Sequence, residues 1–185
     1  KRVDANVICV GNVIIGGGGK TPVVQFLVKK HKSVAIILRG YGGRLSGFKP
    51  IRVDPKVHSA LDVGDEALMH SKMAPTYICK DRYLAAKAAV DDGAKVIIMD
   101  DGFQNFSLVK DRSILVFDSE FGVGNGRVLP SGFLREPLSF ALKRANELYL
   151  LSYDGVFNKP FDANFKKFLV DVLNKKSVKN KLFVS

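Results

Sequence analysis

The sequence has no tryptophan and only two cysteines. Its apolar runs are all much shorter than the about eighteen residues that a membrane-spanning helix needs. No cysteines or histidines stand at zinc-site spacing. No charged leader with an apolar stretch and cleavage site opens the chain, so we expect neither a signal peptide nor a membrane span. Cys9 and Cys79 lie in separate short apolar stretches, which favours buried, reduced thiols over a disulfide framework.

Acidic residues are also scarce. Eighteen Asp and Glu stand against 29 Lys and Arg, and the formal net charge is +11. This charge favours polyanions, anionic lipid surfaces or phosphorylated substrates as partners, without choosing among them. The aromatic residues lie mostly inside apolar runs and do not alternate with Lys and Arg, so we expect no nucleic acid partner.

The length and composition indicate a globular protein with one sizeable core. The chain has 185 residues, of which 46% are apolar and 25% charged. We expect one folded lobe over residues 1–152 and a basic tail, or remnant of a second lobe, over residues 153–185. Residues 158–185 carry seven Lys against two Asp, and apolar residues recur there at loosely helical spacing. A basic amphipathic helix and a frayed end are both open for this segment.

Short, nearly all-apolar runs alternate with helical patterns along the chain. We expect strands over residues 7–11, 34–38, 76–80, 95–99, 113–117 and 147–151. Helices are expected after Thr21 and over residues 65–72, 81–90 and 137–144. Runs that are apolar throughout are typical of parallel strands covered on both faces. The sequence therefore predicts an α/β fold like that of P-loop NTPases, with a mostly parallel sheet and helices on both faces.

A glycine-rich turn stands between the first expected strand and the first expected helix. Strand, glycine turn and helix in this order are typical of a P-loop, in which backbone N–H groups surround phosphate oxygens. Lys20 would place a positive charge beside the phosphates and act as a catalytic residue. Thr21 would provide a hydroxyl group for Mg²⁺. The predicted nucleotide-binding residues are Ile14, Ile15, Gly16, Gly17, Gly18, Gly19, Lys20, Thr21 and Pro22.

The P-loop pattern is degenerate, because Ile14 stands where the usual signature has its first glycine. A flexible glycine turn followed by a chance Lys-Thr pair is the alternative. The flanking strand and helix patterns favour the P-loop.

The second half of a phosphate site would be an apolar strand that ends in an acid. Residues 96–101, VIIMDD, have this form, and we predict that Asp100 and Asp101 serve Mg²⁺ together with Thr21. Adjacent residues on a strand point to opposite faces, so the two acids cannot do the same job. Turn formation before Gly102 is the alternative for the pair, and the presence of Lys20 and Thr21 favours the metal site.

Five segments together resemble the tetraacyldisaccharide 4'-kinase family, the kinases of lipid A biosynthesis. They occur in the family's order and lie within about residues 7–151. The segments are VGNVIIGGGGKTPVV (10–24), LRGYGGR (38–44), VGDEALM (63–69), MDDGFQN (99–105) and GNGRVLPSGFLREPL (124–138).

The resemblance implies transfer of the ATP γ-phosphate, with Mg²⁺, to the 4'-hydroxyl of a tetraacyldisaccharide 1-phosphate. It also implies a cytoplasmic protein in peripheral contact with the inner membrane surface. An anionic glycolipid and an anionic membrane both suit the net charge of +11.

The same resemblance assigns roles to single residues. Asp65 corresponds to the family's catalytic base, although from the residues alone a helix N-cap at Asp65 is the favoured reading. The substrate cleft would include Arg39, Tyr41, Gln104, Asn125, Arg135 and Glu136.

The chain departs from the family in ways that bear on activity. Gly18 replaces a residue that is usually polar, and nothing after about Leu151 resembles the second lobe, which supplies a histidine that acts with the base. We expect His31, His58 and His70 to lie at the surface. The competing hypothesis is therefore a nucleotide-binding fragment of such a kinase without transferase activity.

Overall fold

A computed structural model describes residues 1–16, 19–118, 121–152 and 179–184. The chain forms two compact units. Unit 1 consists of Lys1–Cys9 and Val24–Asp111, and unit 2 of Val10–Val23 and Arg112–Ser185. Strand β1 (Asn6–Gly11) and helix α1 (Lys20–Lys30) each begin in one unit and end in the other. The domain boundary that we expected at residue 152 stays a prediction.

Unit 1 contains a four-stranded portion of sheet in the order β3-β4-β2-β5. Strand β2 (Val34–Leu38) pairs in parallel with both β4 (Thr76–Ile78) and β5 (Val96–Asp100), whereas the short β3 (Ile51–Arg52) is antiparallel to β4. The central residues of β2, β4 and β5 are buried, as expected of parallel strands covered on both faces.

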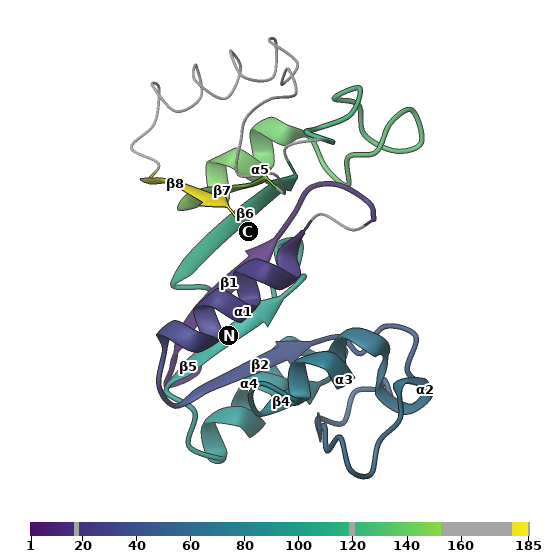
Figure 1. Ribbon diagram of the computed structural model, residues 1–185, viewed down its shortest axis with the longest axis vertical. Helices are drawn as coiled ribbons and strands as arrows, with labels where there is room; N and C mark the ends of the chain where they lie inside the picture. Colours follow the sequence, from purple (N-terminus) through teal and green to yellow (C-terminus); the bar gives the residue numbers. More distant parts are fainter. Residues whose placement is uncertain (17–18, 119–120, 153–178, 185) are drawn as a thin grey trace. The chain divides into compact units, whose positions relative to one another are not determined.

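Three helices accompany this sheet: α2 (Ala60–Val63), α3 (Asp65–Ser71) and α4 (Arg82–Asp91). Helix α4 packs on β2 and β4, and α3 packs on β4 (Figure 1). Helix α4 begins where it does because the Asp81 carboxylate accepts hydrogen bonds from the backbone N–H groups of Tyr83 (2.8 Å) and Leu84 (3.4 Å). Such an N-cap satisfies donors that have no partner inside the helix.

Unit 2 contains three parallel strands in the order β6-β7-β8. They are β6 (Arg112–Asp118), β7 (Glu147–Ser152) and β8 (Lys179–Val184). Helix α5 (Leu138–Arg144) packs beside β6 and buries Ala141 and Leu142 (Figure 1). Strand β6 is buried along its middle, which makes it the core strand of this unit.

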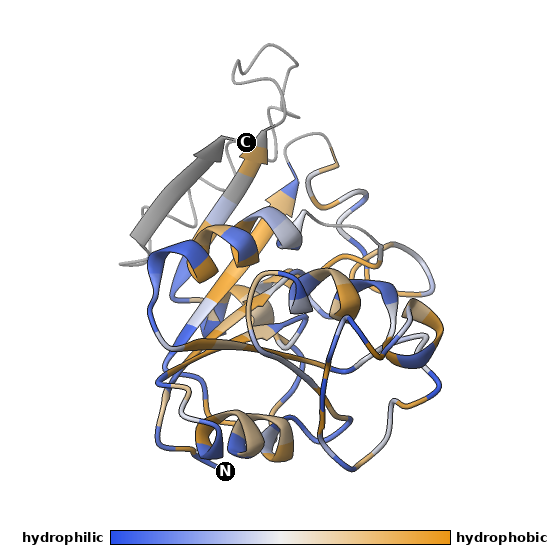
Figure 2. Cartoon of the chain, turned by 60° about the horizontal axis from the view of Figure 1, so that its bottom comes forward, coloured by the Kyte–Doolittle hydropathy of each residue, from blue (hydrophilic) through white to orange (hydrophobic). Residues whose placement is uncertain are grey.

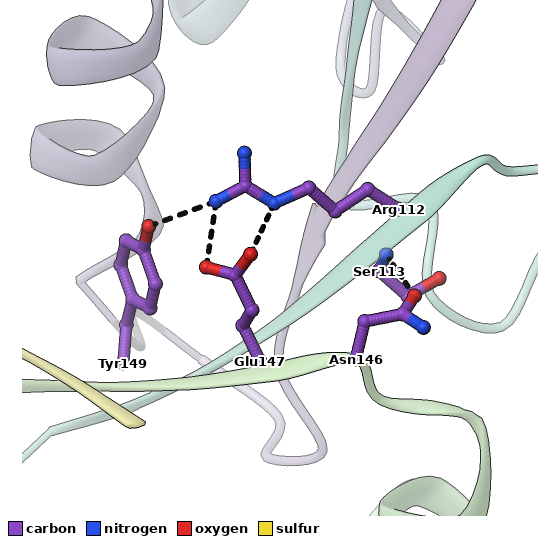
Figure 3. Close-up of polar contacts among 5 residues, drawn as sticks. All are labelled: Arg112, Ser113, Asn146, Glu147 and Tyr149. Atoms are coloured by element: carbon purple, nitrogen blue, oxygen red, sulfur yellow. Dashed lines mark hydrogen bonds and ion pairs between the residues drawn. The ribbon is translucent and has the colours of Figure 1, made fainter. Parts of the chain in front are cut away.

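A polar cluster joins the first residues of β6 and β7 (Figure 3). The Arg112 guanidinium donates two hydrogen bonds to the Glu147 carboxylate, from Nε to Oε1 and, at 2.6 Å, from Nη2 to Oε2. Nη2 also donates to the Tyr149 hydroxyl at 3.3 Å. Next to them, the Asn146 side chain accepts a hydrogen bond from the backbone N–H of Ser113. The cluster fixes which residues of the two strands lie side by side.

Most of the expected elements are confirmed to within one or two residues at each end. Hydrophobic colour follows the strands in Figure 2, as the apolar runs predicted. Both cysteines are buried and free. The short elements β3 and α2 were missed, because two to four residues are too few to establish a period.

The expectation of a helix or frayed end over residues 158–185 is wrong for residues 179–184, which form β8. The rest of that expectation falls outside the described residues. No helix in the described part of the chain combines the length and apolar character needed to cross a membrane.

Candidate functional site

The P-loop segment of unit 2 has the local structure that the sequence predicts. Strand β1 ends at Gly11, and α1 begins at Lys20 and Thr21, so both side chains lie in the first turn of the helix. Gly16 has a φ of +103°, a backbone conformation open to glycine and strained for other residues. No acidic residue lies in the first turn of α1, which leaves the positive end of the helix dipole uncompensated by side chains there.

Pro22 occupies the third position of α1. Proline is tolerated in a first turn, where its missing N–H costs no helical hydrogen bond. Gly17 and Gly18 lie outside the described residues.

The approach to the P-loop is paired with a second predicted segment. Ile14 forms an antiparallel bridge with Leu134, and Ile15 donates its backbone N–H to the carbonyl oxygen of Phe133 (3.0 Å). Arg135 in turn donates its N–H to the Val13 carbonyl oxygen (2.7 Å). The structure thus brings Arg135 next to the start of the phosphate loop, although the two segments are more than a hundred residues apart in the sequence.

Two predicted substrate residues of unit 2 make hydrogen bonds within the protein. Asn125 donates from Nδ2 to the Ser131 carbonyl oxygen (2.9 Å) and accepts the N–H of Arg127 at Oδ1 (3.1 Å). Glu136 accepts a hydrogen bond from Arg144 of α5 at 2.7 Å. Both side chains shape the loop before α5, and their roles toward substrate stay predictions.

Asp65 is the first residue of α3 and is exposed. The N-cap is Gly64, and it makes no side-chain capping bond, so the favoured reading of Asp65 as N-cap is wrong. An acid in the first turn still interacts favourably with the helix dipole. The position leaves the Asp65 carboxylate open to solvent at the start of the helix.

The loop after β2 carries Arg39 and Tyr41, both of which are exposed. The Ser46 hydroxyl donates to the Arg39 carbonyl oxygen (2.7 Å), and the Gly43 N–H donates to Gly40, so the loop is held by its own hydrogen bonds. Its backbone lies against Gly64, the residue before Asp65. Two predicted segments of unit 1 therefore meet.

Asp100 and Asp101 follow one another at the end of β5 in different surroundings. Asp100 is buried, whereas Asp101 is half-buried and has a φ of +48°, a left-handed conformation that Asp adopts more readily than most residues. This difference fits the expectation that the two acids do different jobs. Gln104, in the turn that follows, is half-buried.

His70 is a correction to the sequence analysis, which expected a surface residue. It is fully buried on α3, and its Nε2 lies 2.8 Å from Oδ2 of Asp100. Ala67 and His70 stand three positions apart on α3, which is the spacing of one helix face, and both are buried. Helical periodicity would therefore have predicted the burial of His70, although not its partner.

Arg82, at the start of α4, was also missed. Its side chain is buried, and Nη1 donates to the Cys79 carbonyl oxygen at 2.7 Å. Burial, followed by repulsion from Arg39, lowers the pKa of the guanidinium, and attraction to Asp101 and Asp100 opposes this. Arg82 thus brings positive charge to the acids at the end of β5.

One carboxylate oxygen of the predicted metal-binding acids has the surroundings of a cation ligand. Asp100 Oδ1 is buried and has no hydrogen-bond partner, as expected of an oxygen that faces a metal or its water. In the described part of the chain, no three His, Cys, Asp or Glu side chains gather as a metal cluster. Other ligands, such as phosphate oxygens and water, would therefore have to complete the coordination shell.

The predicted residues belong to two sets, each within one unit. Unit 1 holds Arg39, Tyr41, Asp65, Asp100, Asp101 and Gln104, and unit 2 holds Ile14–Pro22, Asn125, Arg135 and Glu136.

Comparison with known proteins gives consistent results. A family model described as "Tetraacyldisaccharide-1-P 4'-kinase" matches residues 1–179. A "Tetraacyldisaccharide 4'-kinase" of Parvibaculum lavamentivorans is 54% identical over 154 residues, which cover 81% of this chain and 44% of that protein. One of Rhodospirillum centenum is 50% identical over 152 residues, 80% of this chain and 44% of that protein. The chain therefore spans less than half the length of these curated relatives.

A solved structure is similar as well. The "apo" form of LpxK from Aquifex aeolicus in complex with ATP superposes with a TM-score of 0.73 and 27% identity, over 100% of this chain and 72% of that chain. The fold is thus the α/β fold that the sequence predicts, with a mostly parallel sheet. The chain belongs to the tetraacyldisaccharide-1-P 4'-kinase family.

Proposed function

We propose that this chain binds ATP and transfers its γ-phosphate to the 4'-hydroxyl of a tetraacyldisaccharide 1-phosphate. Membership of the kinase family carries the proposal, since the family model covers residues 1–179. The relative of known structure was crystallised with ATP. The order of strand, glycine-rich segment and helix from Asn6 to Lys30 is the order expected of a phosphate site and supports the proposal.

The phosphate site works through charge and backbone donors. The Lys20 ammonium would neutralise charge on the β- and γ-phosphate oxygens, and the backbone N–H groups of residues 16–21 would donate to the same oxygens. The residues that would hold Mg²⁺ are Thr21, Asp100 and Asp101, and the unpartnered Oδ1 of Asp100 supports this. When bound, Mg²⁺ supplies further neutralisation of the transferring phosphoryl group.

The acceptor side of the reaction needs a base for the sugar hydroxyl. Asp65 is exposed at the start of α3, where its carboxylate can reach a substrate from solvent. We assign it the role of accepting the 4'-hydroxyl proton during transfer. Substrate contacts are assigned to Arg39, Tyr41, Gln104, Asn125, Arg135 and Glu136.

The substrate's chemistry fits the charge of the chain. A glycolipid 1-phosphate and the lipid surface that holds it are both anionic, and the chain carries +11. We therefore also propose peripheral contact with the cytoplasmic face of the inner membrane, with no nucleic acid as partner.

The deciding experiment is a transfer assay with ATP, Mg²⁺ and detergent-solubilised disaccharide 1-phosphate. Formation of the bisphosphorylated lipid supports the proposal. The Lys20→Ala variant, shown to be folded by circular dichroism, should lose product formation. Unchanged transfer in that variant would contradict the phosphate-site assignment.

A second candidate is that these 185 residues bind nucleotide without transferring phosphate. The observation that favours it is that they span 44% of the length of the two relatives above. Phosphoryl transfer depends on positioning and on the exclusion of water, which a two-lobed kinase achieves by closure. Nucleotide affinity from calorimetry, together with absence of lipid product, would select this candidate, and robust turnover would reject it.

A further inference from the structure

The side chains of His70 and Asp100 form a buried pair in unit 1. Nε2 of His70 lies 2.8 Å from Oδ2 of Asp100, and the side chains are 0% and 3% exposed. The other ring nitrogen, Nδ1, and the other carboxylate oxygen, Oδ1, are buried without hydrogen-bond partners. The contact therefore engages one oxygen of the carboxylate and leaves the second one unused.

Carboxylate chemistry determines the direction of this hydrogen bond. A carboxylate that binds Mg²⁺ is ionised and only accepts hydrogen bonds, so the inference requires the proton on Nε2 of His70. Donation to Oδ2 restrains rotation of the carboxylate, and Oδ1 keeps its lone pairs. An oxygen of this kind is a suitable ligand for Mg²⁺, either directly or through a bound water.

We propose that His70 is a positioning residue, which orients Asp100 and leaves its Oδ1 available as a ligand for Mg²⁺. The inference rests on the nucleotide site of the proposed function. His70 itself touches neither nucleotide nor metal, and it acts through Asp100. Among the described residues, His70 is the side chain that hydrogen-bonds to Asp100. The buried Arg82 instead directs its Nη1 to the carbonyl oxygen of Cys79.

The place of His70 in the fold extends the effect of this contact. His70 lies on α3, the helix whose first residue is Asp65, and Asp100 is the last residue of β5. The hydrogen bond therefore attaches the helix of the assigned base to the strand of the metal acid. A small displacement of reacting groups is costly in phosphoryl transfer, which depends mainly on positioning.

A role in packing alone does not account for the pair. An apolar side chain at position 70 would fill the same space, but it would leave the buried carboxylate of Asp100 without its hydrogen bond, and removal of one partner of a buried pair is costly. Packing also leaves the unpartnered Oδ1 unexplained, because buried polar atoms are nearly always hydrogen-bonded. A cation opposite Oδ1 accounts for this oxygen.

The test compares three variants of the 185-residue chain: His70→Leu, His70→Asn and His70→Gln. Leucine fills the space without a donor, asparagine is too short to reach Oδ2, and glutamine places an N–H close to the position of Nε2. ATP affinity is measured by calorimetry with Mg²⁺ and again with a chelator. We expect the gain in affinity due to Mg²⁺ to fall by roughly 10- to 100-fold for leucine and asparagine and to recover for glutamine. Affinity in chelator should stay unchanged.

Histidine ¹⁵N NMR of the unaltered protein provides a readout that is independent of nucleotide. The proposal requires the tautomer with the proton on Nε2, and the other tautomer would overturn it. The matched control is His58→Leu, which removes a half-buried histidine whose Nδ1 accepts a hydrogen bond from the backbone of Asp54. Its gain in affinity with Mg²⁺ should equal that of the unaltered chain.

The outcomes separate this inference from the proposed function. If the unaltered chain binds ATP more tightly with Mg²⁺, and folded His70→Leu does so to the same extent, the role of His70 is overturned and the nucleotide site stands. If the unaltered chain binds ATP equally well with Mg²⁺ and with chelator, the role of His70 and the metal assignment of Asp100 are overturned, and the nucleotide site stands. If His70→Leu does not fold, glutamine and asparagine decide, and equal gains for these two overturn the inference.

Discussion

The backbone carbonyl oxygen of Tyr41 lies directly against Gly64. A Cβ atom at position 64 would approach this oxygen more closely than 3.0 Å, and Gly64 has a φ of +91°. Both facts favour glycine at position 64. A side chain would clash with the carbonyl oxygen, and a positive φ is strained for residues other than glycine. The contact holds the exposed loop of Arg39 and Tyr41 against the residue that precedes Asp65.

The first prediction separates these two demands at Gly64. Gly64→Ala should destabilise the chain by about 1–3 kcal/mol more than Gly93→Ala, because overpacking adds to the backbone strain. Gly93 is the matched control, since its φ is +95° and nothing lies within 4 Å of a Cβ built there. Urea unfolding of both variants measures the difference. Equal losses would show that the approach of Tyr41 costs nothing.

The second prediction concerns the ion pair of Arg112 and Glu147, whose side chains are 24% and 9% exposed. Glu147→Leu should cost roughly 2–4 kcal/mol, because it leaves a partly buried guanidinium without its carboxylate. The double variant Arg112→Leu with Glu147→Leu should recover most of this loss. A double-mutant cycle in urea measures the coupling, and simple addition of the two losses would contradict the prediction.

The third prediction assigns Asp65 to the acceptor and not to ATP. Asp65→Asn should reduce phosphate transfer by roughly 10²- to 10⁴-fold, because the amide cannot accept the hydroxyl proton, while ATP affinity stays nearly unchanged. Transfer is measured at saturating ATP, and affinity by calorimetry. Asp91→Asn, at the exposed end of α4, is the control and should preserve both quantities. Parallel losses of affinity and transfer would instead make Asp65 a nucleotide or structural residue.

The fourth prediction is a pH dependence that arises from Cys9. Burial raises the pKa of its thiol from 9.0 to about 12. A raised pKa gives stability that is present below about pH 9 and is lost as the pH rises towards 12, because only the unfolded chain ionises readily in this window. At pH 10.5 the loss from this group is about 2 kcal/mol.

Urea unfolding at pH 8 and pH 10.5, in reducing buffer, checks this value for the unaltered chain and for Cys9→Ala. Other groups also titrate in this range, so the relevant quantity is the difference between the two proteins. The unaltered chain should lose about 2 kcal/mol more than the variant between the two pH values. Equal pH dependence would mean that the Cys9 thiol ionises as easily in the folded as in the unfolded chain.

Elements with a strong local pattern were predictable. Strand β2 was expected over residues 34–38 and is observed there. A short all-apolar run bounded by polar residues is typical of a buried strand in an α/β protein. Helix α4 was expected from Asp81, whose carboxylate does cap it. Strand β8 was not predicted, since residues 179–184 begin with the polar run Lys-Asn-Lys and the strand appears through its parallel pairing with β7.

Site residues divide in the same way. The sequence by itself determined the family, the order of the phosphate loop and the acids, and the expected positions of Lys20 and Asp100, because strand ends and helix starts follow from local patterns. Tertiary structure alone decided that His70 is buried against Asp100, thirty positions away, and that Asn125 and Glu136 have partners within the protein. The physical reason is that a hydrogen bond between distant residues depends on the packing of whole elements, and the residue types on either side of a contact do not reveal it.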